Sequence, residues 1–152
     1  MVKIGFSTTN KILSRLIRKV TGAKVSHVWF LVEVYEKSFV IQADIGGVTI
    51  TPFSDWEKKW RVVEIVSPKI EINLAPAWDM LGQKYDYAGL VGCAWVYLGR
   101  VFKKKWANPL ASSHALFCSE YILDVLKTDN YPGTADIIGD RFSPEDLLKL
   151  LK

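Results

Sequence analysis

The chain has 152 residues, of which 49% are hydrophobic and 24% are charged, and its formal net charge is +4. A chain of this length fits one core, and this composition excludes an intrinsically disordered protein. The two cysteines are too few for a disulfide framework, and no CxxC pattern or Cys/His cluster indicates structural zinc. We therefore expect a single domain over residues 1–152, with no metal or other cofactor and no nucleic acid as partner.

The targeting signals are weak. The start of the chain lacks a continuous apolar stretch followed by a small-residue cleavage site, so we predict no signal peptide. The longest apolar run, Tyr87 to Gly99, is shorter than the roughly 20 residues that a bilayer span needs. These features predict a cytoplasmic or virion-associated protein. The run continues into Arg100 and three lysines, which suit either peripheral contact with a membrane or a core helix with a solvated basic end.

The first half of the sequence is rich in strand signals. A helix between the first two strands has an apolar stripe, with Thr9 or Asn10 as its cap, Gly22 at its end, and Arg15, Arg18 and Lys19 on the solvated face. Trp56 and Trp60 lie one helical turn apart after a possible Ser54 cap, as expected of a lid over the core. The predicted strands cover residues 2–8, 25–35, 39–45, 48–53 and 61–68, with turns at 35–38 and at Gly46-Gly47.

The second half is rich in helix signals. A short helix, a break at Gly82 and a longer helix capped by Asp86 precede a loop. A further helix is predicted from Cys118 to Lys127, and a last one begins after Ser143 with Pro144 in its first turn. Because strands come first and helices follow, we predict an α+β fold in which an antiparallel β-sheet packs against helices.

Cys118 is the candidate nucleophile. A thiol in the first turn of a helix feels the positive end of the dipole and free backbone N–H groups. With an imidazolium nearby, such placement lowers a cysteine pKa from about 8.5 into the range of roughly 3.5–7.5. A buried structural cysteine is the alternative. A zinc site formed from Cys93, Cys118 and the two histidines matches no familiar ligand spacing.

His27 is the candidate base, since a neutral imidazole can take the thiol proton and return it to a leaving group. A hydrogen-bonded core histidine is the alternative. Gln42, on the strand expected to pair with that of His27, can hold the other ring nitrogen, and Asp44 on the same face is its substitute. Glu33 also falls on the His27 face, but farther along the strand. His114, four residues before Cys118, is a competing base or a substrate contact.

The order His27, Gln42, Cys118 resembles that of the circularly permuted papain-like thiol hydrolases of the NlpC superfamily, especially the YiiX-like branch. The resemblance covers nearly the whole chain and includes five segments: SRLIRKVTGAKVSHVWFLVE, FVIQA, GQKYDYAGL, FCSEYI and FSPEDL. It implies a permuted papain-like fold with Cys118 as nucleophile, His27 as base and Gln42 as the residue that orients the histidine. Trp29 departs from the family pattern, which often has a glycine soon after the histidine.

The resemblance implies a cysteine peptidase or amidase that cleaves an amide or ester bond through a thioester. The expected partners are peptide, peptidoglycan or acyl-lipid substrates. Two other functions stay open: a lipid-directed thiol acyltransferase or lipase at a membrane interface, and a catalytically inactive binding module on the same fold. The sequence does not determine the oligomeric state.

Overall fold

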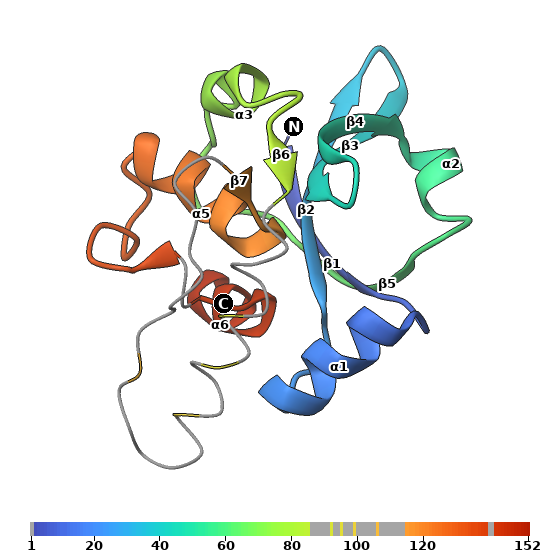
Figure 1. The fold of residues 1–152 in the computed structure, drawn as a ribbon. Helices are drawn as coiled ribbons and strands as arrows, with labels where there is room; N and C mark the ends of the chain where they lie inside the picture. Colours follow the sequence, from blue (N-terminus) through green and yellow to red (C-terminus); the bar gives the residue numbers. More distant parts are fainter. Residues whose placement is uncertain are drawn as a thin grey trace.

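A five-stranded antiparallel sheet dominates the computed structural model, which describes residues 2–85, 115–139 and 142–152 together with Gly92, Trp95, Gly99 and Trp106. The strand order is β4-β3-β2-β1-β5 (Figure 1). The strands are β1 Val2–Thr8, β2 His27–Val34, β3 Lys37–Asp44, β4 Gly47–Pro52 and β5 Arg61–Val66. Every neighbouring pair runs antiparallel, which confirms the predicted α+β fold with an antiparallel sheet.

The helices gather mainly on one side of this sheet, where α5 and α6 lie (Figure 1). A parallel pair of two-residue strands, which the sequence did not predict, links the segment before residue 86 to the start of α5. No helix in the described parts of the chain has the length and apolar character needed to cross a membrane. The elements are α1 Ile12–Thr21, α2 Phe53–Trp56, α3 Ala75–Asp79, β6 Lys84–Tyr85, β7 Ala115–Leu116, α5 Cys118–Thr128 and α6 Pro144–Leu151.

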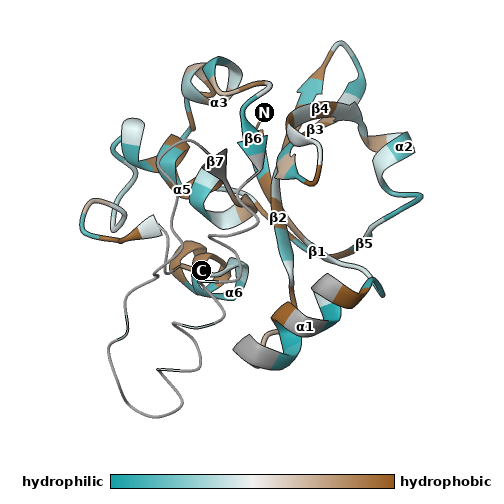
Figure 2. Cartoon of the chain, viewed as in Figure 1, coloured by the Kyte–Doolittle hydropathy of each residue, from teal (hydrophilic) through white to brown (hydrophobic). Residues whose placement is uncertain are grey.

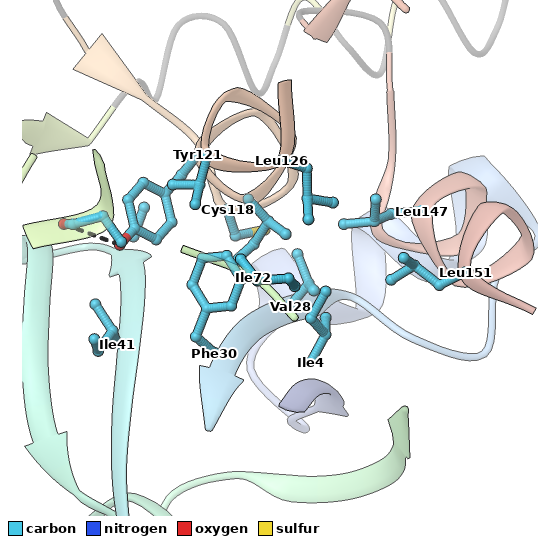
Figure 3. Close-up of a cluster of buried hydrophobic side chains, with 14 of the residues drawn as sticks. Ile4, Val28, Phe30, Ile41, Ile72, Cys118, Tyr121, Leu126, Leu147 and Leu151 are labelled. Carbon is cyan, nitrogen blue, oxygen red and sulfur yellow. Dashed lines mark hydrogen bonds between the residues drawn. The ribbon is translucent and has the colours of Figure 1, made fainter. Parts of the chain in front are cut away.

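The sheet buries side chains on both faces because successive residues of a strand point to opposite sides. On one face, the even-numbered residues of β2 pack with α5, and Figure 3 shows Val28 and Phe30 beside Cys118 and Tyr121. On the other face, Trp29 and Leu31 of β2 form a second cluster with Val40 and with Trp56 of α2. Strand β2 therefore lies between two cores.

The second cluster depends on a glycine in the neighbouring strand. Gly5 pairs with Trp29 in the β1–β2 register, and a Cβ atom on Gly5 would overlap the Trp29 indole. The indole N–H donates a hydrogen bond to Oγ of Ser7 at 3.2 Å. The missing side chain of Gly5 thus makes room for Trp29.

Helix boundaries follow the predictions in part. Gly22 ends α1 with φ of 66°, and Ser143 caps α6 through a reciprocal capping box with Asp146, both as predicted. The predicted cap of α1 is wrong, because Lys11 takes that position without a side-chain bond, while Oγ1 of Thr9 accepts its N–H. The predicted Ser54 cap is also wrong, since α2 begins one residue earlier.

Some predicted elements fall outside the described residues. They are the longer helix expected after Asp86, of which only Gly92, Trp95 and Gly99 are described, the basic stretch from Arg100 to Lys105, and the loop that contains His114. Cys93 lies in the same part of the chain. The break at Gly82 is described and is confirmed as a turn residue with φ of 82°.

Candidate functional site

The amide of Gln42 has a fixed orientation because its two neighbours have opposite hydrogen-bonding character. Nε2 of Gln42 donates to Oδ2 of Asp44 at 2.9 Å, and a carboxylate only accepts. Oε1 of Gln42 lies 2.7 Å from the indole nitrogen of Trp56, which only donates. The amide oxygen is therefore the atom that faces His27.

This orientation selects one tautomer of His27. Nε2 of the ring lies 2.7 Å from Oε1 of Gln42, so Nε2 must carry the proton and donate it. The lone pair of the neutral ring is then on Nδ1. The ring stacks on Trp60, with centroids 4.2 Å apart and an angle of 21° between the planes. Gln42 and Trp60 hold the imidazole from its edge and from its face.

Burial keeps His27 neutral at ordinary pH. The residue is 3% exposed, and desolvation lowers the pKa of the imidazole from 6.5 to about 4. The hydrogen bond to Gln42 and the negative charge of Asp44 raise that pKa, but by less than burial lowers it. A neutral ring with its lone pair on Nδ1 has the protonation state that a general base needs.

Cys118 is the first residue of α5, as predicted, and lies within the larger buried cluster, beside Val28 and Phe30 (Figure 3). Burial raises the pKa of its thiol from 9.0 to about 11, although the backbone N–H groups of Val28, Ser119 and Cys118 act in the opposite direction. The expected lowering of this pKa is therefore wrong for the resting structure, because desolvation outweighs the helix N-terminus. The resting thiol is protonated.

The cysteine and the histidine approach the same end of β2 from different sides. The sulfur faces the backbone N–H of Val28, the residue that follows His27. The side chain of Val28 packs in the core with Cys118, whereas His27 contacts Gln42 and Trp60 on the other face. Among the described residues, no hydrogen bond joins the thiol to the imidazole. One residue of backbone thus separates the two groups in the resting structure.

The end of β2 at His27 is also where the sheet opens. The β2–β3 register runs from Val34–Lys37 only as far as Phe30–Ile41, so residues 27–29 of β2 have no ladder partner on β3. The Gln42 end of β3 pairs with β4 instead. This end of β2 is therefore less restrained by its neighbour on the β3 side than the rest of the strand.

A groove of about 230 Å³ leads to His27. Its polar and charged lining includes Asp44, Lys59 and Trp60, and Ser14 and Ser26 share a hydrogen bond of 2.6 Å on its wall. Lys11, the N-cap of α1, and Ile17 within that helix form another part of the lining. The groove gives a small polar ligand access to the histidine face of the sheet.

The tryptophans are the site residues that sequence reasoning missed. Trp56 and Trp60 were expected to lie one helical turn apart as a lid over the core. Both pack in the second cluster, although α2 ends at Trp56 and Trp60 lies beyond it. Trp56 binds Gln42 and Trp60 stacks on His27. Their nearness to Gln42 depends on long-range packing, and only the indole N–H, which needs a partner when buried, gave a signal. Glu33 is exposed and pairs with Lys3 at 3.2 Å, away from the site.

No family model and no curated protein matches the chain. Among solved structures, it is similar to the crystal structure of the metalloprotein YiiX from Escherichia coli O157:H7. The TM-score is 0.50 and the identity 23%, over 84% of this chain and 64% of that one. The chain has a YiiX-like fold. The match at this identity concerns the fold alone, and the chain spans less than two thirds of the length of YiiX.

The description of YiiX as a metalloprotein prompts a test of the donor atoms in this chain. Across residues 2–85, 115–139 and 142–152, no three His, Cys, Asp or Glu side chains come together as a metal-binding group. Near His27, Asp44 is the closest acidic residue that affects its pKa, and its Oδ2 already accepts from Gln42. The described residues therefore do not fit a metal centre.

Proposed function

We propose that the chain is a cysteine hydrolase of the permuted papain-like kind, which cleaves an amide or ester bond through a thioester on Cys118. The main support for this proposal is the arrangement of side chains at the start of β2. Gln42 binds Nε2 of His27 and leaves Nδ1 as the proton acceptor, while Cys118, the first residue of α5, packs in the same cluster as Val28, the residue that follows His27. The YiiX-like fold supports the proposal at the level of architecture.

In the proposed reaction, the thiol proton of Cys118 passes to Nδ1 of His27 as the sulfur attacks the substrate carbonyl. A carbon–sulfur bond forms, and backbone N–H groups at the start of α5 stabilise the oxyanion. The carbon–nitrogen or carbon–oxygen bond then breaks, and the leaving group takes the proton from Nδ1. Water attacks the thioester, releases the acid and restores the thiol.

This reaction requires the thiol and the imidazole to approach each other when substrate binds, because they share no hydrogen bond in the resting structure. Catalytic hydrogen bonds often tighten only in the complex with substrate. Because residues 27–29 have no ladder partner on β3, fewer backbone hydrogen bonds oppose such a shift. The proposal covers peptide, peptidoglycan and acyl-lipid substrates, because a thiolate attacks the carbonyl carbon of each.

The test is acylation of Cys118 by an activated ester, read by mass spectrometry of the intact protein and of its peptides. The wild type and the Cys93→Ser variant should gain one acyl group on Cys118. The Cys118→Ser variant should gain none on that peptide, and His27→Gln should acylate at least about 100-fold more slowly, the lower end of what a general base contributes. Equal acylation rates in the wild type and His27→Gln would remove His27 as base, and labelling confined to other residues would remove the hydrolase.

A non-enzymatic binding module is the second candidate, and one observation favours it. In the resting structure both the Cys118 thiol and the His27 imidazole are neutral, because the pKa of Cys118 is raised to about 11 and that of His27 is lowered to about 4. A protein of this kind would bind peptides or acyl-lipids without forming the acyl-enzyme. Binding of a peptidoglycan fragment or a lipid with unchanged affinity in Cys118→Ser, together with no acylation of the wild type, would favour the module.

A further inference from the structure

The positive charge of the chain is concentrated at its start. Six of its 20 lysines and arginines lie in the first 32 residues, which contain no aspartate or glutamate. The other 14 basic residues are outnumbered by the 16 acidic residues. The net charge of +4 therefore comes from β1, α1 and the start of β2, and the remainder of the chain is slightly acidic.

Helix α1 presents most of this charge on one surface. A shallow hollow of about 800 Å³ is lined by Ile12, Arg15, Arg18, Lys19, Ala23 and Lys24. Arg15, Lys19 and Lys24 are exposed, and Lys11 extends the same surface. Among the described residues, none of these five basic side chains forms an ion pair. Glu145 of α6 lies nearby, where it accepts the backbone N–H of Lys24 at 3.1 Å.

An apolar side chain protrudes from this basic surface. Ile12, in the first turn of α1, is 86% exposed. Figure 2 shows polar and apolar residues together on α1, which lies at the periphery of the sheet. Basic side chains around a protruding aliphatic residue match the interface of an anionic bilayer, where lysine and arginine meet headgroups and the aliphatic group enters the acyl boundary. A nucleic acid would use the basic residues but would leave Ile12 exposed to water.

We propose that the basic surface formed by Lys11, Ile12, Arg15, Lys19 and Lys24 docks the protein on an anionic lipid bilayer. Lys11, the N-cap of α1, belongs to this surface and also lines the groove that leads to His27, so the two features adjoin at that residue. The docking itself does not depend on catalysis. The further consequence, that the substrate is a lipid or is held at a lipid surface, rests on the proposed function.

The test is co-sedimentation of the purified chain with vesicles of phosphatidylcholine containing 30% phosphatidylserine. We expect the protein to pellet with these vesicles at 100 mM salt, to remain in solution with pure phosphatidylcholine, and to be released by 500 mM salt through charge screening. Each basic residue near such a surface contributes about fivefold to binding. Arg15→Glu/Lys19→Glu should thus bind at least about 25-fold more weakly, and Ile12→Ser should bind several-fold more weakly.

The matched control reverses two exposed lysines elsewhere. Lys37→Glu/Lys69→Glu has the same net charge as the α1 double variant, but its changes lie outside the basic surface. Circular dichroism establishes that all variants are folded. Equal weakening of binding in both double variants would overturn the proposal, as would no binding of the wild type, or Arg15- and Lys19-dependent binding of RNA without binding to vesicles. Because sedimentation does not measure catalysis, vesicle binding without acylation would reject the proposed function and leave the docking surface intact.

Discussion

The buried, neutral state of His27 predicts a specific loss of stability in acid. The pKa of the ring is about 4 in the folded protein and has its ordinary value of 6.5 in the unfolded chain. Between these two values the unfolded chain binds a proton that the folded protein does not, so stability falls as the pH falls through this window. At about 1.4 kcal/mol for each pH unit, the loss is about 2 kcal/mol at pH 5 and about 3 kcal/mol at pH 4.

The assay is urea denaturation of the wild type and His27→Gln at pH 7.5, 6, 5 and 4. Both proteins share every other titratable group, so the difference between their pH profiles isolates His27. The substitution changes the stability at pH 7.5, but we expect the gap between the two proteins to shift by about 2 kcal/mol in favour of the variant at pH 5. Parallel profiles would refute the burial argument, since the imidazole would then titrate equally in both states.

Three further substitutions or modifications test other parts of the site. Trp56→Phe removes the indole donor to Gln42 and should cost about 1–2 kcal/mol in urea denaturation. The Nε2–H tautomer of His27 should persist in ¹⁵N NMR because Asp44 still orients the amide, and a mixture of tautomers would contradict the role of Asp44. In a Cys93→Ser background, the rate of Cys118 alkylation by iodoacetamide should have its pH midpoint near 11. The stability of the folded protein should fall above pH 9, because the thiol of the unfolded chain ionises first. An alkylation midpoint below pH 8 would contradict a desolvated thiol. Gly5→Ala should cost about 1–3 kcal/mol in thermal unfolding because its Cβ would displace Trp29, whereas Gly46→Ala, whose Cβ would meet its nearest atom at 3.4 Å, should cost less.

The strands and the contact between His27 and Gln42 were predictable because they depend on short-range patterns. Alternation and turn residues located the five strands, and the polar residue in FVIQA lay on the strand that pairs with that of His27. The cap of α6 followed from Ser143 and the acidic residue three positions later. The strands and the cap follow from residues within a few positions of one another, whereas the contact between His27 and Gln42 also needed the two strands that carry them to be neighbours.

The electrostatics of the site could not be predicted because they depend on long-range packing. The helix start at Cys118 was correct, but the direction of its pKa depends on the core of β2 and α5 that surrounds it. Alternation places His27 and Val28 on opposite faces, yet only the assembled sheet shows that α5 covers the Val28 face. Asp44 was a substitute for Gln42 in the sequence, whereas in the structure it holds the Gln42 amide.

The end of β2 that pairs with β1 but not with β3 makes its backbone sensitive to chemical changes at the Cys118 sulfur. The amide of Val28 has no partner strand on the β3 side and faces Sγ of Cys118, a weak acceptor. Acylation, oxidation or ionisation of that sulfur changes the acceptor and therefore the chemical shift and solvent exchange of the Val28 amide proton, along with those of Ser119 and Cys118. Val28 is thus a built-in spectroscopic reporter, which follows the state of Cys118 without a substrate, a dye or an attached label.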